Sequence, residues 1–210
     1  MKIELKNVSK QFKDNIVLSN INLSFSENKI YGFAGRNGSG KSVLIKMLVG
    51  LYLPSDGEIT WDGKKLNMKK EFPENIGALI EKPNFFTDLT GLENLKLLAN
   101  IRKKIGVEEI ENALKIVNLT IDKNKKYSKY SLGMKQKLGI AQAIMENPEF
   151  VILDEPFNGI EEETVKKIKT YLKTLKDQNK TVIISSHIKE DLIELCDEIY
   201  LFDTGFVKKV

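Results

Sequence analysis

The stretch "GRNGSGKS", residues 35–42, decides the fold class. It fits the pattern G-x-x-x-x-G-K-[ST], in which a glycine-rich loop joins the end of a β-strand to the start of an α-helix. The flanking sequence provides both elements, because "KIYGFAG" at 29–35 is a compact apolar strand and residues 41–51 have a helical pattern. This context favours a phosphate-binding loop over an ordinary glycine-rich turn.

The residues of this loop are candidates for binding a nucleotide. Glycines let the backbone approach a ligand closely, and backbone amides at a helix N-terminus attract an anion. The pattern places Lys41 to reach the β- and γ-phosphates and the Ser42 hydroxyl to ligate Mg²⁺. We therefore predict an ATP-binding loop formed by Gly35, Arg36, Asn37, Gly38, Ser39, Gly40, Lys41 and Ser42.

A second segment, "FVILDEP", ends a buried apolar strand in two adjacent acids, Asp154 and Glu155. Buried carboxylates without partners are costly, so a neighbouring metal–nucleotide complex explains them better than an exposed turn does. We expect Asp154 to hold the metal's water shell and Glu155 to accept a proton from an attacking water.

The single histidine, His187, directly follows the strand-like segment "TVIISS". A lone histidine usually has no catalytic role. The carboxyl ends of parallel strands are, however, where such folds place ligands. His187 is therefore a second catalytic candidate beside Glu155, and from the residues alone both interpretations stay open.

The rest of the chain alternates strands with helices, which predicts an α/β fold around a parallel sheet. Residues from about 90 to 146 have helical periodicity throughout, so we expect a helical subdomain at about 83–145 inside a single domain of residues 1–210. The other expected strands are 3–12, 17–25, 75–81, 149–155 and 198–203, and residues 57–64 are expected to form a strand and a turn. The other expected helices are 161–176 and 189–196.

Composition and charge narrow the class of protein. No apolar run approaches the roughly 18 to 20 residues that span a bilayer, and the N-terminus lacks a signal-peptide pattern. The net charge of +4 allows a nucleic-acid or membrane partner, but the lysines are spread along the chain. We therefore expect a soluble chain that is cytosolic, or that lies at the cytosolic face of another component, with no nucleic-acid partner.

The order of these motifs resembles the nucleotide-binding domain of ATP-binding cassette (ABC) proteins over the whole chain. "GRNGSGKS" resembles the Walker A loop, "VILDEP" the Walker B strand with its catalytic glutamate, and "YSLGMKQKLGIAQAI" the family signature. The resemblance implies a P-loop NTPase fold with a RecA-like core, an N-terminal antiparallel β layer and the inserted helical subdomain. It also implies that His187 is the switch histidine and that Phe12 stacks on adenine, unless Phe12 is an ordinary strand aromatic.

The signature departs from the common L-S-G-G-Q. Its places are occupied by Tyr130, Ser131, Leu132, Gly133 and Met134. The resemblance implies that residues Ser131 to Met134 face the ATP of the opposite subunit, with a hydroxyl from Ser131 and a backbone N–H from Gly133 on the γ-phosphate. The D-loop acid, Glu161, replaces the usual aspartate and is one methylene longer.

Glu81, in "LIEKPNFF", occupies the place of the Q-loop glutamine found in most of the family. The resemblance implies that it ligates Mg²⁺ together with Ser42 and Asp154, and a carboxylate suits this hard ion. The alternative is an ordinary acid at a strand end. With the signature, this segment resembles the branch of bacterial exporters for bacitracin and lantibiotic-type peptides. The residues that follow, Asn84, Phe85 and Phe86, are the expected contact with a membrane partner, unless they are buried in the helical subdomain.

In ABC proteins each ATP lies between the P-loop of one subunit and the signature of the other. The resemblance therefore implies an Mg²⁺-dependent ATPase that works as a homodimer or with a paired second ABC subunit. It implies a separate permease, and a location at the cytoplasmic face of the cell membrane through that permease. Two alternatives stay open, a regulatory cassette and a non-transport ABC ATPase, and the sequence names no substrate.

Overall fold

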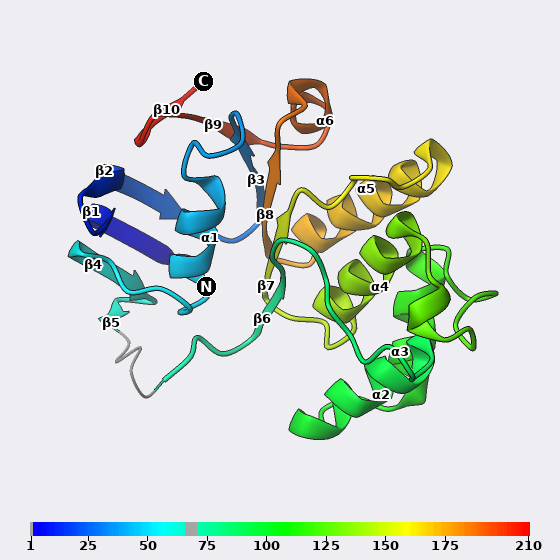
Figure 1. Cartoon of the computed structure of the whole chain (residues 1–210). Helices are drawn as coiled ribbons and strands as arrows, with labels where there is room; N and C mark the ends of the chain where they lie inside the picture. Colours follow the sequence, from blue (N-terminus) through cyan, green and yellow to red (C-terminus); the bar gives the residue numbers. More distant parts are fainter. Residues whose placement is uncertain (1, 66–70) are drawn as a thin grey trace.

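The computed structural model describes residues 2–65 and 71–210, and this part of the chain forms two sheets (Figure 1). The antiparallel sheet has the order β2 (Asn15–Phe25), β1 (Ile3–Phe12), β4 (Asp56–Trp61), β5 (Lys64–Lys65). The larger sheet has the order β10 (Phe206–Lys209), β9 (Glu198–Asp203), β3 (Lys29–Ala34), β8 (Thr181–Ser186), β7 (Phe150–Asp154), β6 (Ile76–Leu79). Its strands pair in parallel, except that β10 is antiparallel to β9.

The helices lie on both faces of the parallel sheet (Figure 1). The short helix α1 (Lys41–Leu48) lies between the two sheets, on the side of the antiparallel layer. The other helices are α2 (Gly91–Arg102), α3 (Val107–Ile116), the 3₁₀ turn η1 (Tyr127–Lys129), α4 (Leu132–Ile144), α5 (Glu162–Asp177) and α6 (Lys189–Ile193). Because α2 to α4 follow β6 and precede β7, the helical middle of the sequence is an excursion between two neighbouring parallel strands.

Burial explains the two kinds of strand in the sequence. Every residue of β7 and β8 is buried, so these strands are continuously apolar up to their polar ends. In β1, which forms part of the surface layer, buried and exposed positions are mixed. The aromatic side chains of Phe25, Phe33 and Phe150 are fully buried in the core between the two sheets.

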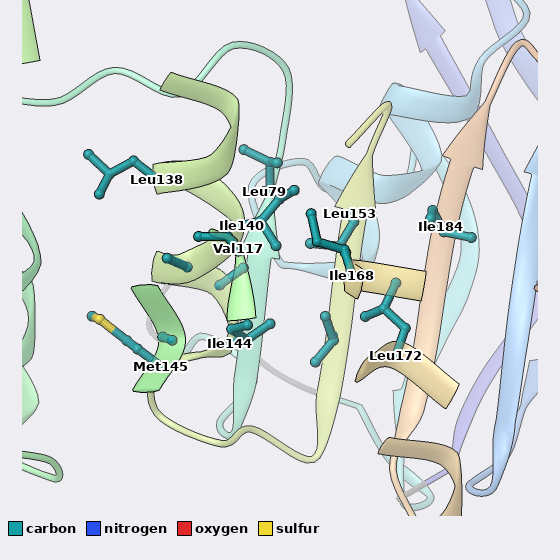
Figure 2. Packing of buried hydrophobic residues seen from close by; sticks show 14 of the residues in the cluster. Leu79, Val117, Leu138, Ile140, Ile144, Met145, Leu153, Ile168, Leu172 and Ile184 are labelled. Atoms are coloured by element: carbon teal, nitrogen blue, oxygen red, sulfur yellow. The ribbon is translucent and has the colours of Figure 1, made fainter. Parts of the chain in front are cut away.

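A second core lies on the opposite face of the parallel sheet. Figure 2 shows α4 and α5 packing their apolar side chains against β6, β7 and β8. Labelled members of this core are Leu79, Val117, Leu138, Ile140, Ile144, Met145, Leu153, Ile168, Leu172 and Ile184. The parallel sheet is thus covered on both faces, and its strand ends remain as the accessible edge for a ligand.

Two expected helix ends were wrong, and one strand was missed. The helix expected at 41–51 ends at Leu48, because the amides of Gly50 and Leu51 turn back onto carbonyls of Met47 and Lys46 in a Schellman-type stop. The helix expected at 189–196 ends at Ile193, since the chain must reach Asp197, whose amide donates to Ile30 of β3. Strand β10 was missed altogether, because its mostly exposed residues show little apolar alternation.

The termini of α2 and α4 are fixed by side-chain caps. Thr90 accepts from the amide of Glu93 and Glu93 accepts from the amide of Thr90, which is a capping box for α2. Ser131 caps α4 by accepting from the amide of Met134 at 3.2 Å.

Among the helices that the structure describes, none combines the length and the apolar composition that crossing a membrane requires.

Candidate active site

Four adjacent parallel strands end at the same edge of the sheet (Figure 1). Gly35 directly follows β3, His187 follows β8 and Glu155 follows β7, while Glu81 lies two residues beyond β6. Carboxyl ends of parallel strands are where open α/β sheets place ligands. The sheet therefore gathers residues that are far apart in sequence into one site.

The glycine-rich loop forms one wall of a cavity of about 440 Å³. Lys41, the first residue of α1, is 5% exposed, and its ammonium donates to the carbonyls of Gly35 at 2.6 Å and Arg36 at 3.1 Å. The first amides of any α-helix have no partner inside the helix and favour an anion. The cavity is lined by Phe12, Val17, Asn37, Gly38, Ser39, Gly40, Lys41, Ser42, Val43 and Glu155.

Phe12 lies at the rim of this cavity. Its ring packs edge-on against Tyr52, with 5.4 Å between the ring centroids, and the side chain is 40% exposed. A partly exposed aromatic ring beside a phosphate-binding loop is able to stack on a flat ring, and the ammonium of Lys10 lies 4.8 Å from the centroid of the Phe12 ring. The geometry is compatible with the predicted adenine contact, which stays a prediction.

Asp154 ends β7 almost fully buried, and a serine from the next strand holds its carboxylate. The Ser185 hydroxyl donates to Asp154 Oδ1 at 2.5 Å. The same Ser185 oxygen accepts from the amide of Glu155 at 2.9 Å. One buried serine on β8 therefore fixes both acids of the "DE" pair.

Glu155 has two environments, one for each carboxylate oxygen. Oε2 lies 2.7 Å from His187 Nδ1, and Oε1 lies 3.8 Å from the Lys41 ammonium. The residue has a φ of 48°, which is the left-handed region that non-glycine residues rarely occupy. The structure thus brings Lys41, Asp154, Glu155 and His187 into one cluster.

Two buried polar atoms of this cavity have no hydrogen-bond partner in the described residues. They are Ser39 Oγ and Glu155 Oε1, and both residues line the cavity. Buried polar atoms are nearly always satisfied, so such atoms require an explanation. A polar ligand with its own donors and acceptors, such as a nucleotide and its attacking water, would satisfy them.

Glu81 also has a left-handed backbone, with a φ of 57°, but its side chain is 60% exposed. The carboxylate pairs with the ammonium of Lys46 on α1 at 2.5 Å. This hydrogen bond raises the pKa of Lys46, against the opposing effect of burial. The structure therefore places Glu81 beside a lysine that the sequence did not predict as its partner.

The signature residues are not part of the cavity that the P-loop lines. Ser131 and Leu132 are exposed at the start of α4, whereas Gly133 is buried against the loop that follows β7. A β-carbon at Gly133 would lie 2.2 Å from the carbonyl oxygen of Gly159, so only glycine fits there. Within one chain, the exposed start of this helix is free to face another molecule.

The predicted D-loop acid pairs inside its own chain. Glu161, the N-cap of α5, lies 3.1 Å from the ammonium of the buried Lys137 on α4. A backbone hydrogen bond of its own and the bond from Lys137 lower the pKa of Glu161. The intrachain partner was not predicted from the sequence.

The donor set fits a magnesium–nucleotide complex better than a metal held by protein alone. In the part of the chain that the structure describes, no three or more His, Cys, Asp or Glu side chains form a metal cluster. Ser42 and Asp154 offer a hydroxyl and a carboxylate, the hard oxygen donors that Mg²⁺ prefers. Mg²⁺ characteristically combines one or two such protein ligands with phosphate oxygens and water.

A separate groove of about 600 Å³ lies beside the segment that follows Glu81. Phe85 packs edge-on against Tyr127 in the helical core, while Phe86 is 63% exposed at the groove. The buried Asn94 on α2 holds this segment by accepting from the Phe86 amide and donating to its carbonyl. Each of the two alternatives therefore describes one phenylalanine. Phe85 packs against the helical core, and Phe86 is exposed at the surface.

Sequence reasoning missed three residues that contact the predicted site residues. They are Lys46 beside Glu81, Ser185 beside Asp154 and Glu155, and Gln136, whose Nε2 donates to the Glu155 carbonyl at 3.0 Å. The serine pair that ends "TVIISS" was a signal, because hydroxyls at the end of a fully buried strand need partners. Gln136 lies in the segment that resembles the family signature, and no contact with Glu155 is predicted from that resemblance. Its role depends on packing between α4 and β7, which periodicity cannot provide.

Comparison with known proteins shows the family of this chain. A family model described as ABC transporter matches residues 18–158. The bacitracin transport ATP-binding protein BcrA of Enterococcus faecalis is 42% identical over 97% of this chain and 67% of its own length. The lantibiotic transport ATP-binding protein SrtF of Streptococcus pyogenes is 32% identical over 94% of this chain and 85% of its own length.

Solved structures show the same fold. A bacterial ABC transporter cassette determined as a dimer superposes with a TM-score of 0.90 at 28% identity, covering 99% of this chain and 97% of that one. A dimeric cassette in a post-hydrolysis state with ADP and phosphate gives 0.88 at 25% identity, covering 99% and 97%. These matches confirm the predicted P-loop NTPase fold. The chain belongs to the ABC transporter family, as an ATP-binding subunit with ATPase activity.

Proposed function

We propose that ATP binds in the cavity walled by residues 35–42, with Phe12 against the adenine and Lys41 on the β- and γ-phosphates. The observation that carries this proposal is the convergence of Lys41, Asp154, Glu155 and His187 at one sheet edge. Beside them lie two buried polar atoms that have no hydrogen-bond partner among the described residues. The loop amides and the helix start supply the remaining positive field for phosphate.

The proposed reaction is attack of water on the γ-phosphorus. The water oxygen bonds to phosphorus while Glu155 takes one proton from that water. The bond between phosphorus and the bridging oxygen breaks, and ADP leaves. His187, hydrogen-bonded to the other oxygen of Glu155, orients that carboxylate and contacts the γ-phosphate. Lys41 offsets the charge on the phosphates. Bound Mg²⁺, held by Ser42, Asp154 and Glu81, would neutralise phosphate charge.

The complete site requires a second subunit. Ser131, Leu132, Gly133 and Met134 lie outside the P-loop cavity, and the start of α4 is exposed. We propose a head-to-tail dimer, with a second copy or a paired ABC subunit, in which the start of α4 faces the partner's ATP. Dimeric relatives among the solved cassettes support this arrangement.

The groove beside Phe86 is the proposed docking surface for a separate permease. It combines an exposed aromatic side chain with a backbone fixed by Asn94, so the surface is both apolar and preformed. The segment 82–86 directly follows Glu81, so docking there would reach the nucleotide site. We propose that the subunit is held by this permease at the cytoplasmic face of the membrane.

The proposed cargo is a peptide antibiotic of the bacitracin or lantibiotic kind, moved in the export direction. Support comes from the names of the relatives at 42% and 32% identity. Deleting the chain should lower resistance to such a peptide, and the gene with its permease should restore it. Unchanged resistance to both peptide classes would argue for a different cargo.

The catalytic proposal is tested with Glu155→Gln. The variant should still bind ATP but hydrolyse it on the order of 10² to 10⁴ times more slowly, the range for loss of a general base. Light scattering should show a monomer without nucleotide and, for the variant, a dimer that persists with ATP. A wild-type turnover rate would remove Glu155 from this role.

A further inference from the structure

The backbone of Glu155 is held from two sides by buried side chains. Its amide donates to the Ser185 hydroxyl at 2.9 Å, and its carbonyl accepts from Gln136 Nε2 at 3.0 Å. Gln136 is 5% exposed and Ser185 is fully buried. Together the two side chains occupy both hydrogen-bonding groups of the Glu155 main chain.

These bonds matter because Glu155 has an unfavourable backbone conformation. A φ of 48° places a residue with a β-carbon in the left-handed region, which persists only when the surroundings enforce it. A relaxed backbone would rotate the carboxylate away from its contacts with His187 and Lys41. The two buried side chains supply the enforcing contacts.

We infer that Gln136 and Ser185 are positioning residues, which hold the Glu155 carboxylate at its reacting position by fixing its main chain. The inference rests on the proposed role of Glu155. Gln136 lies on α4, the helix that Ser131 caps, so the same bond joins the signature helix to the main-chain carbonyl of the chain's own hydrolytic glutamate. Ser185 acts on Asp154 as well, which makes Gln136 the cleaner probe.

The test is the turnover of the full-length chain with Gln136→Met, which keeps the length of the side chain and removes the donor. We expect kcat to fall about 10- to 10²-fold, the scale of a misplacement of about 1 Å, while KM and the calorimetric affinity for ATP stay unchanged. The matched control is Gln178→Met, the same change at an exposed residue beyond α5, and it should leave kcat unchanged. Ser185→Ala removes the other contact and should also lower kcat, with part of that loss acting through Asp154, which the same hydroxyl holds.

A double variant distinguishes positioning from general damage. In the Glu155→Gln background, Gln136→Met should cause no further loss, because the group that it positions is already gone. An equal loss in both backgrounds, an unchanged kcat in both single variants, or a loss of ATP affinity that parallels kcat would overturn the inference. Wild-type turnover of Glu155→Gln alone would instead overturn the proposed role of Glu155.

Discussion

Two glutamates follow neighbouring parallel strands, and both have a left-handed backbone. Glu155 follows β7 with φ 48°, and Glu81 lies just beyond β6 with φ 57°. Their surroundings differ sharply. The Glu155 side chain is 20% exposed and its main chain is bound on both sides, whereas Glu81 is 60% exposed and has a single ion pair with Lys46.

This difference suits Glu155 to a fixed position and Glu81 to an exchange of partners. A general base must already be oriented when water attacks, so its surroundings should enforce one position. Mg²⁺ arrives together with the nucleotide, so a side chain that ligates it must be able to give up its earlier partner. An exposed ion pair contributes little free energy, about 0 to 1 kcal/mol, so Mg²⁺ bound with ATP is able to displace Lys46 from Glu81.

The largest expected effect on ATP binding comes from the lysine that faces Glu155. Lys41→Ala should weaken ATP binding by about 10- to 10²-fold, because hydrogen bonds to charged groups are worth about 1.5 to 3 kcal/mol. Calorimetry measures the affinity, with Lys208→Ala on the exposed β10 as the control. Equal affinities for the variant and the wild type would mean that ATP binds elsewhere.

A smaller effect tests the backbone of Glu81. Both Glu81→Gly and Glu81→Ala remove the carboxylate, but glycine tolerates positive φ, so the glycine variant should be more stable by about 1 kcal/mol. Urea unfolding gives the difference. At the next residue, Lys82, φ is not positive, and the same pair of substitutions should favour alanine. A more stable alanine at position 81 would contradict the left-handed backbone.

The smallest effect is the pH dependence of the Lys46–Glu81 pair. The hydrogen bond from Glu81 raises the pKa of Lys46 above its usual 10.5, against the opposing effect of burial. A raised pKa in the folded state stabilises the protein below about pH 10.5 and is lost as pH rises through the raised value. The difference in Tm between wild type and Glu81→Gln should therefore shrink above about pH 10.5. A constant difference would mean that the ion pair does not stabilise the fold.

The fold class was predictable because the segments that determine it are local. "GRNGSGKS", the continuous apolar strands before Asp154 and His187, and the long helical middle each follow from neighbouring residues, and the comparisons confirmed the fold and family. Helix ends were less predictable, because the stop of α1 depends on turned-back amides at Gly50 and Leu51.

The contacts between the site residues were less predictable from the sequence than the identity of those residues. Lys46 and Glu81 are 35 residues apart, and Gln136 and Glu155 are 19 apart, so their contacts follow from packing and not from any local pattern. The left-handed backbone at both glutamates was equally hidden, since neither is a glycine or an asparagine. The roles of the site residues themselves stay predictions.

One Mg²⁺ titration of ATP turnover compares the two glutamates most directly. Glu155→Gln should lower the maximal rate at every Mg²⁺ concentration and leave the midpoint in place. Glu81→Gln should keep most of the maximal rate and move the midpoint to higher Mg²⁺, because a neutral ligand attracts the ion less, and Glu81→Ala should do worse on both measures. A midpoint that stays at the wild-type value in both Glu81 variants, or one that moves in Glu155→Gln instead, would contradict the division into a fixed base and an exchangeable ligand.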